Sequence, residues 1–323
     1  MRKEHNYIIW VLILFVIRLS GEVINPAILP LEKDDTIILK HSGGYDLNNN
    51  NLQDIIGITC RVNQKGEYID NSTKLVLLEL RPNSVVKQRW QYAPKEGRFT
   101  DIKVLDLDGD GKKEFAAICS YKFSGKKHKN DWLYIFEEKN NKIVREYADI
   151  NLKYPRVRAE YLDVGDFDND GISDLLVSSG SPFRAAFIIS SEQLNQGQKT
   201  IKLNKIQLRS GVTKFRAFAA NINDHTGDEI VMASGQEYLE IMVYNPKSGQ
   251  PLEKSIIIKD ETILDLNIEQ ILAANLDGGD YDEIILPFNT GNNYLLSIKN
   301  SIYQVNKLEA MNVRVNDILA GDL

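Results

Sequence analysis

Residues 164–182 read VGDFDNDGISDLLVSSGSP, and this stretch holds the pattern that decides the fold. A short apolar entry leads into a loop with acidic residues at alternate positions, and a run of apolar residues follows directly. The same arrangement occurs as YDLNNNNLQDIIGI at residues 45–58 and as LDLDGDGKKEFAAI at residues 105–118. Self-similarity of this kind is the sequence signature of a repeat architecture.

Two weaker copies continue the repeat, with loops that begin at Asn221 and Asn275. The three strong loops, which begin at Asp46, Asp106 and Asp166, recur every 60 residues, and the next two steps are 55 and 54 residues. The last residues of the chain, LAGDL, repeat the lead-in to a loop once more. The chain therefore carries five copies of one unit and the start of a sixth.

Short strands fill the space between the loops. Runs of about five to eight residues rich in β-branched and aromatic side chains alternate with turn residues, and no long segment has a helical period. Four such strands in each repeat are typical of a propeller blade. We predict an all-β fold, a β-propeller of four-stranded blades over residues 36–323, with about five blades and the start of a sixth. Because a propeller closes its ring to hide its edge strands, we expect this sequence to be part of a seven-bladed ring.

The loops follow the pattern D-x-[DN]-x-[DN]-x-x-x-[DE]. Positions 1, 3, 5 and 9 offer side-chain oxygens and position 7 offers a backbone carbonyl, which together make the hard oxygen cage that Ca²⁺ prefers. We expect about three structural Ca²⁺ sites. Their expected ligands are Asp46, Asn48, Asn50, Leu52 and Asp54; Asp106, Asp108, Asp110, Lys112 and Glu114; and Asp166, Asp168, Asp170, Ile172 and Asp174. At position 6, Asn51, Gly111 and Gly171 suit a backbone with positive φ.

Two other kinds of loop have similar residues, the EF-hand and the Asx-rich turn. An EF-hand needs Glu at position 12, where this chain has Gly57, Ala117 and Val177, so that interpretation fails. An Asx-rich turn that binds no metal stays open, most of all for the first loop, which has two amides among its side chains. The loops at Asn221 and Asn275 lack ligands of the pattern, and we expect hydrogen bonds alone to hold them.

These loops resemble the FG-GAP and VCBS-type repeats of integrin α-subunit propellers and of many exported bacterial proteins. Residues 164–182 carry the resemblance best, and literal Phe-Gly and Gly-Ala-Pro words are missing. The resemblance implies that the metal loops join the first two strands of each blade on one face. It also implies that partners bind the opposite face, here at Asn63–Thr73, Phe123–Asn130 and Ser181–Ala185.

The N-terminus indicates export. Arg2 and Lys3 precede an apolar run, Tyr7–Ile17, that is too short to cross a bilayer as a helix and fits the core of a signal peptide. A buried strand or a short membrane anchor is the alternative. We predict a signal peptide at residues 1–21 and an N-terminal extension at residues 22–35. The mature protein would then be secreted, periplasmic or on the cell surface, without a membrane span.

Composition and motifs narrow the function. A net charge of −6 argues against a nucleic-acid partner, and the chain has no GxSxG, HExxH or P-loop motif. We expect a non-catalytic binding or adhesion module for protein or glycan partners. The alternatives are the propeller portion of a longer secreted enzyme, such as a polysaccharide lyase, and a structural component of a surface assembly. Cys60 and Cys119 either pair or are small core residues, and we favour the core.

Overall fold

The computed structural model describes part of the chain between residues 37 and 308. The described residues are 37–61, 69, 72–82, 85–95, 97–120, 131–140, 142–145, 150–153, 159–179, 186–196, 200–202, 214–223, 226–235, 238–252, 255–259, 266, 271–276, 278–288, 293–299 and 302–308. The expected signal peptide and N-terminal extension lie outside them. The expected partner-binding segments also lie outside the described residues: all of Phe123–Asn130 and Ser181–Ala185, and most of Asn63–Thr73. Within the described residues, no helix is long and apolar enough to span a membrane.

The chain forms two compact units, Met1–Lys95 together with Leu323, and Glu96–Asp322. The described part of the first unit is one antiparallel sheet in chain order. Its strands are β1 (Ile37–Tyr45), β2 (Gln53–Cys60), β3 (Lys74–Arg81) and β4 (Val85–Tyr92). This sheet has the four strands expected of one repeat.

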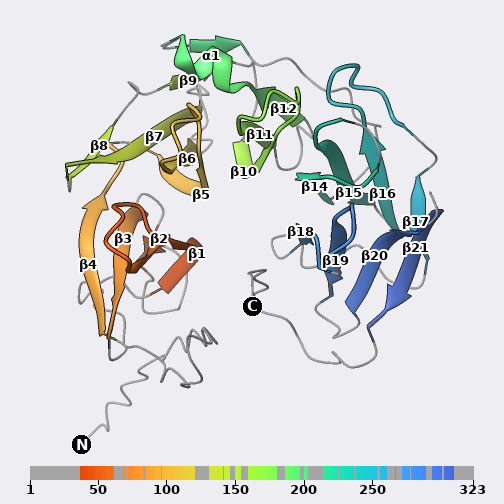
Figure 1. The fold of residues 1–323 in the computed structure, drawn as a ribbon, viewed down its shortest axis with the longest axis horizontal. Coiled ribbons are helices and arrows are strands. Elements are labelled where there is room, and N and C mark those ends of the chain that lie inside the picture. Colours follow the sequence, from red (N-terminus) through yellow and green to blue (C-terminus); the bar gives the residue numbers. More distant parts are fainter. Residues whose placement is uncertain are drawn as a thin grey trace, which may run out of the picture. The chain divides into compact units, whose positions relative to one another are not determined.

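The described residues of the second unit form four sheets, whose elements are labelled in Figure 1. Its first sheet has β5 (Arg98–Leu105), β6 (Glu114–Ser120), β7 (Asp131–Lys139), β8 (Lys142–Arg145), β9 (Ile150–Lys153) and, later in the chain, β13 (Thr200–Lys202). The next has β10 (Ala159–Gly165), β11 (Asp174–Ser179) and β12 (Ala186–Ile189), followed by helix α1 (Ser191–Asn195). The last two have β14 (Lys214–Ala220), β15 (Glu229–Gly235), β16 (Leu239–Tyr244) and β17 (Ile256–Ile258), then β18 (Leu272–Ala274), β19 (Glu283–Pro287), β20 (Asn293–Lys299) and β21 (Ile302–Lys307). The fold is all-β with almost no helix.

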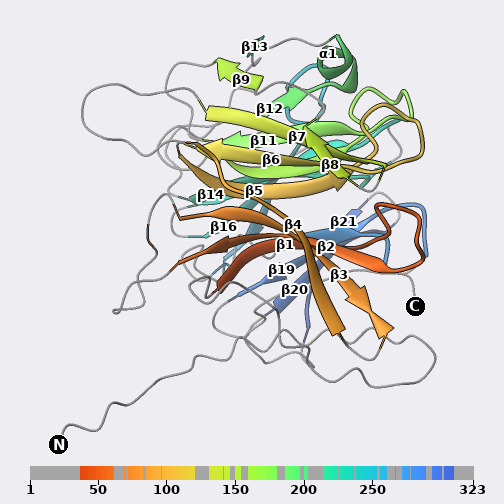
Figure 2. The ribbon, with the colours of Figure 1, turned by 90° about the vertical axis from the view of Figure 1, so that its left-hand side faces the viewer.

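Two of these sheets depart from the expected four strands. In the first, β5, β6 and β7 lie side by side (Figure 2), and β7 pairs with β8 along one half and with β9 along the other. Strand β13 then adds to β9 in parallel. The sheet of β10–β12 has only three strands, because Ser190 starts helix α1 directly after β12. Its side chain accepts from the N–H of Gln193, and the Gln193 side chain accepts in return from the N–H of Ser190, a capping box.

Strands β6 and β11, the second strands of their sheets, are buried along their whole length. Successive side chains of a strand point to opposite faces, so a strand that is covered on both faces must be apolar throughout. In β11, Leu175 and Val177 belong to a cluster shared with β5–β7, whereas Leu176 packs with Ala217 and Ile230 of the next sheet. Continuous apolar runs after each loop are therefore what this packing requires.

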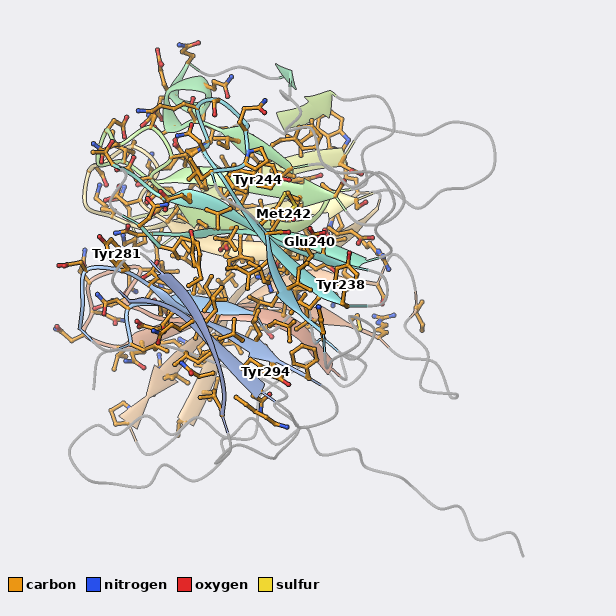
Figure 3. The ribbon with its side chains drawn as sticks, turned by 90° about the vertical axis from the view of Figure 1, so that its right-hand side faces the viewer. Tyr238, Glu240, Met242, Tyr244, Tyr281 and Tyr294 are labelled. Carbon is orange, nitrogen blue, oxygen red and sulfur yellow. The ribbon has the colours of Figure 1, made fainter. Side chains whose placement is uncertain are left out.

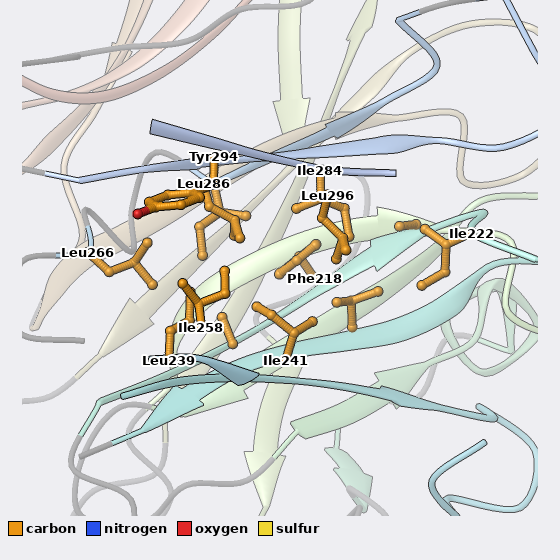
Figure 4. Packing of buried hydrophobic residues seen from close by; sticks show 14 of the residues in the cluster. Phe218, Ile222, Leu239, Ile241, Ile258, Leu266, Ile284, Leu286, Tyr294 and Leu296 are labelled. Atoms are coloured by element: carbon orange, nitrogen blue, oxygen red, sulfur yellow. The ribbon is translucent and has the colours of Figure 1, made fainter. Parts of the chain in front are cut away.

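Consecutive sheets of the second unit pack face to face. Figure 4 shows one cluster, in which Phe218 and Ile241 meet Ile284 and Leu296 of the following sheet. Strand β16 serves two clusters: its alternate residues Met242 and Tyr244, labelled in Figure 3, pack toward β10–β12 instead. The first strands also touch in sequence, β5 with β10, β10 with β14 and β14 with β18. This stacking places the loops after the first strands at corresponding positions.

The two cysteines are core residues. Cys60 at the end of β2 and Cys119 in β6 are buried, and neither forms a disulfide in the structure. This agrees with the interpretation that we favoured from the sequence.

Candidate metal-binding loops

Each repeated loop connects the first two strands of a sheet. We number them loop 1 (46–54), loop 2 (106–114), loop 3 (166–174), loop 4 (221–229) and loop 5 (275–283). In all five, the residue before position 1 pairs across the hairpin with the residue at position 9: the pairs are Tyr45 with Asp54, Leu105 with Glu114, Gly165 with Asp174, Ala220 with Glu229 and Ala274 with Glu283. The five loops are therefore structural equivalents, including the two that depart from the sequence pattern.

In loops 2 and 3, the acids at positions 1, 3 and 5 converge. Each set offers three carboxylate oxygens that lie within 4.8 Å of one another, close enough for one cation to bind all three. The two sets are Asp106, Asp108 and Asp110, and Asp166, Asp168 and Asp170. Position 1 is partly buried in both loops, whereas positions 3 and 5 are exposed. These are the side chains that the sequence pattern singled out.

The backbone of each strong loop holds its first ligand. The carboxylate at position 1 accepts a hydrogen bond from the N–H of position 6. The donors are Asn51 at 2.6 Å, Gly111 at 3.0 Å and Gly171 at 2.9 Å. These residues have φ of 64°, 83° and 84°, which matches our expectation for position 6. Because hydrogen bonds within the loop already fix it, position 1 is oriented before any cation arrives.

Positions 5 and 7 form the same turn in the three strong loops. The side-chain oxygen at position 5 accepts from the N–H of position 7, and the distance is 2.8 Å in each case. The donors are Leu52, Lys112 and Ile172, and the acceptors are Asn50, Asp110 and Asp170. In loops 2 and 3, the carboxylate at position 3 also accepts from the N–H of position 5. The local chain thus folds the same way whether the side chain is an amide or a carboxylate.

Position 9 has a role that the sequence pattern did not indicate. In every loop its buried carboxylate accepts from the backbone N–H of position 2, seven residues earlier. The pairs are Asp54 with Leu47, Glu114 with Leu107, Asp174 with Phe167, Glu229 with Ile222 and Glu283 with Leu276, at 2.7–3.3 Å. A carboxylate oxygen has two lone pairs, so this bond leaves capacity for a cation. In loops 4 and 5 the acid closes the hairpin in the same way.

Loop 3 differs from loops 1 and 2 in the partners of its acids. Asp174 is 1% exposed, and burial together with Asp168 and Asp170 raises its pKa to about 6, against hydrogen bonds from the N–H groups of Ser191 and Phe167. Within the described residues, no basic side chain forms an ion pair with the acids of this loop. The three converging carboxylates of this loop, Asp166, Asp168 and Asp170, fit a hard divalent cation such as Ca²⁺, whereas Asp174 is not one of the converging set.

Loop 2 has a protein cation beside its ligands. The Lys112 ammonium donates to Asp110 at position 5, and this contact lowers the pKa of the Asp110 carboxyl. Glu137 of β7, which is buried, follows Phe136, the register partner of Phe115, and pairs with Lys139 at 2.5 Å. A cation that binds loop 2 therefore competes with Lys112 for one carboxylate.

In loop 1, a partly buried arginine pairs with the acid at position 9. Arg89 of β4 donates to both oxygens of Asp54, at 3.1 and 3.3 Å, and lies 3.5 Å from Glu79. The Asn50 amide donates to Glu79 at 3.0 Å. Burial would raise the pKa of Glu79, but hydrogen bonds from Arg81 and Asn50 and the charge of Arg89 lower it. The sequence pattern did not indicate Arg89 or Glu79, although a charged residue inside the apolar run of β3 was a signal.

One atom of loop 1 nevertheless fits a cation. Asn48 is at position 3, and its side-chain oxygen Oδ1 is buried with no hydrogen-bond donor among the described residues. Buried polar atoms of this kind are rare in native proteins and call for a partner such as an ion or a water molecule. The loop thus keeps one unsatisfied oxygen at position 3, with an arginine beside position 9.

Loop 5 is closed by hydrogen bonds from its first residue. The Asn275 side chain accepts from the N–H of Gly278 at 2.8 Å and donates to the carbonyl of Gly279 at 2.6 Å. An amide group that donates into the loop does not offer that nitrogen to a cation. In loop 4, His225 lies outside the described residues, as does Asp277 in loop 5.

A comparison with known families agrees with the repeat. Residues 106–177 match the family model described as FG-GAP-like repeat. The matched segment starts at position 1 of loop 2 and ends in β11, so it contains both loops with converging acids. A search of curated proteins found no match to the chain.

Proposed function

We propose that this chain, an FG-GAP-type repeat protein, is an exported Ca²⁺-binding β-propeller that acts as a non-catalytic binding or adhesion module for protein or glycan partners. The observation that carries the proposal is the convergence of three carboxylates in loop 2 and again in loop 3. Both sets lie at the same point of an equivalent hairpin, which is how a repeated structural metal site is built.

The propeller arrangement is supported by the packing within Glu96–Asp322. The sheets β10–β12 and β14–β17 each bury one face against the sheet before them and the other face against the sheet after them. The first strands touch in chain order, as neighbouring blades around an axis would. The sheets are then the blades, and the loops between first and second strands lie on one face. Partners would bind the opposite face, whose expected segments lie mostly outside the described residues.

The ion is proposed as a structural element. Ca²⁺ would neutralise acids that repel one another and tie positions 1, 3, 5 and 9 together. In loop 3 the residues that would hold it are Asp166, Asp168, Asp170 and Asp174, with the carbonyl of Ile172. An ion that binds only the folded state stabilises it by about 2.7 kcal/mol at a concentration 100 times Kd. A rigid face of loops would then support a binding surface elsewhere on the molecule.

Loop 3 is proposed as the tightest site. Loop 2 must displace Lys112 from Asp110, and loop 1 shares Asp54 with Arg89. Charge competition of this kind weakens cation binding because the site is already partly neutralised. We therefore expect affinity to decrease from loop 3 to loop 2 to loop 1.

Calorimetric titration of the full chain with Ca²⁺ tests the proposal. We expect about three binding events, of which the tightest is lost in Asp168→Ala and the second in Asp108→Ala. Glu192→Ala, an exposed change on helix α1, is the control and should leave the titration unchanged. If the wild-type chain takes up no Ca²⁺, the loops are hydrogen-bonded turns and the proposed function is wrong.

A further inference from the structure

Asp228, at position 8 of loop 4, forms hydrogen bonds to the backbone of Asp166, the first residue of loop 3. The carboxylate of Asp228 accepts from the backbone N–H of Asp166 at 2.8 Å, and the backbone N–H of Asp228 donates to the carbonyl of Asp166, also at 2.8 Å. Two hydrogen bonds in opposite directions join these residues, which are 62 positions apart in the sequence. Both backbone polar groups of a candidate metal ligand are thus bound by the neighbouring loop.

The same pair of hydrogen bonds joins loop 5 to loop 4. The carboxylate of Asp282, at position 8 of loop 5, accepts from the N–H of Asn221 at 2.9 Å, and its own N–H donates to the Asn221 carbonyl at 2.6 Å. Asn221 is position 1 of loop 4. Position 8 is Gln53, Lys113 and Ser173 in loops 1 to 3, so the acid occurs only in the two loops that depart from the metal pattern.

The backbone comes unusually close at the first of these contacts. Gly227 has a φ of 86°, and a Cβ added there would lie 2.7 Å from the carbonyl oxygen of Asp166. A Cβ at Gly165 would lie 2.7 Å from the Asp228 carboxylate. Only glycine fits on both sides of the contact. Loops 3 and 4 are therefore in close contact at the backbone of Asp166.

We propose that Asp228 is a positioning residue for the cation site of loop 3. It holds the backbone of Asp166 from the adjacent sheet, so the carboxylate of Asp166 stays in place for the ion. Residues that orient a ligand in this way typically change metal affinity by about 10–100-fold when they are replaced. Loop 4 thus contributes to a neighbouring site although it lacks a ligand set of its own. The inference rests on the Ca²⁺ binding proposed above.

Coupling must act in both directions. If the Asp228 contact favours Ca²⁺ at loop 3, Ca²⁺ must strengthen the docking of loop 4 on loop 3 by the same free energy. Asp282 makes the same pair of bonds but holds Asn221, which belongs to no strong loop. It supplies a matched control, because its replacement removes an equivalent contact without touching a candidate ligand.

The experiment compares Asp228→Ala with Asp282→Ala in the full chain, in an Asp108→Ala background that removes the loop 2 site. Calorimetric titration measures Ca²⁺ affinity, and thermal unfolding reports stability. We expect both variants to lower Tm, but only Asp228→Ala to weaken the tightest remaining Ca²⁺ site, by about 10-fold or more. Asp228→Asn keeps an oxygen acceptor for the Asp166 N–H and should fall between Asp228→Ala and the parent.

Equal Ca²⁺ affinity in Asp228→Ala and Asp282→Ala would overturn the inference, because Asp228 would then only join two loops. If Asp228→Ala does not fold, the comparison of Asp228→Asn with Asp282→Asn decides in the same way. Asp168→Ala separates the two proposals. If it abolishes the tightest site while Asp228→Ala does not weaken that site, only the positioning role fails. If the parent binds no Ca²⁺, both proposals fail.

Discussion

Glu229 makes the protein's stability depend on pH near neutrality. Burial raises the pKa of this carboxyl from its ordinary value of 4.5 to about 7; Asp228 adds to the rise, and hydrogen bonds from Ile222 N–H and Asn223 oppose it. The perturbation is Glu229→Gln, which keeps an oxygen acceptor for the Ile222 N–H and removes the charge.

The sign follows from proton release. Between pH 4.5 and about 7 the unfolded chain has lost this proton while the folded protein still holds it, so stability falls as pH rises. The full difference corresponds to about 3 kcal/mol, reached above pH 7. Below pH 4.5 both states are protonated, and Glu229 contributes no pH dependence. In Glu229→Gln this contribution is absent at every pH.

Urea unfolding at pH 5 and pH 8, followed by tryptophan fluorescence, measures the effect. We expect the loss of unfolding free energy between these pH values to be smaller in Glu229→Gln than in the wild type by about 3 kcal/mol. Glu229→Ala controls for the hydrogen bond: it leaves the Ile222 N–H without its acceptor and should be destabilised by about 1–3 kcal/mol relative to Glu229→Gln at both values. Wild-type and Glu229→Gln stabilities that change in parallel between pH 5 and 8 would refute the reasoning.

Three further predictions concern packing and the loop contacts. Leu175→Ala should destabilise the protein by about 2–5 kcal/mol in urea unfolding, because Leu175 is fully buried in the cluster between two sheets; an unchanged midpoint would contradict that packing. Gly227→Ala should lower Tm, at a cost of about 1–3 kcal/mol from its positive φ and a further cost from the clash of the new Cβ with the Asp166 carbonyl; a Tm equal to the wild type would contradict both the φ and the close contact of loops 3 and 4. Arg89→Met should lower stability and yet strengthen Ca²⁺ binding at loop 1 in calorimetry, since Asp54 loses its guanidinium partner; weaker Ca²⁺ binding would show that Arg89 supports the site.

The sequence predicted correctly those features that depend on residues close together in the chain. Alternate acids followed by an apolar run predicted five equivalent hairpins, because a loop of fixed length between two buried strands leaves the chain little choice. The expected positive φ at Asn51, Gly111 and Gly171 is found for the same reason. The all-β fold and the FG-GAP-like repeat are confirmed.

What the sequence could not indicate depends on contacts between distant segments. Asp228 and Asp282 stand at position 8, which the ligand pattern leaves open, whereas each binds the backbone of a loop about 60 residues earlier. Arg89 lies 35 residues from the carboxylate that it contacts. Strand β13 pairs with β9 of another repeat, a choice that no period within one repeat encodes. Spacing within a repeat predicts the hairpin, but side chains that join repeats follow from the packing of the sheets.

The acids at position 9 illustrate both what the sequence indicates and what only the structure shows. Their occurrence in all five loops was visible in the sequence, and a ligand was the natural interpretation. The structure adds that each accepts a hydrogen bond from position 2, including Glu229 and Glu283 in the loops without a full ligand set. A residue type retained for hairpin closure can therefore resemble a metal ligand wherever the rest of the pattern is lost.

Thermal unfolding of the full chain in excess Ca²⁺ and in EGTA, beside the Asp108→Ala/Asp168→Ala double variant, tests the central claim most directly. The account predicts that Ca²⁺ raises the Tm of the wild type by several degrees, since each occupied site adds about 2.7 kcal/mol at 100 times Kd, and that the double variant loses most of this rise. Equal Tm values of the wild type in Ca²⁺ and in EGTA would contradict it.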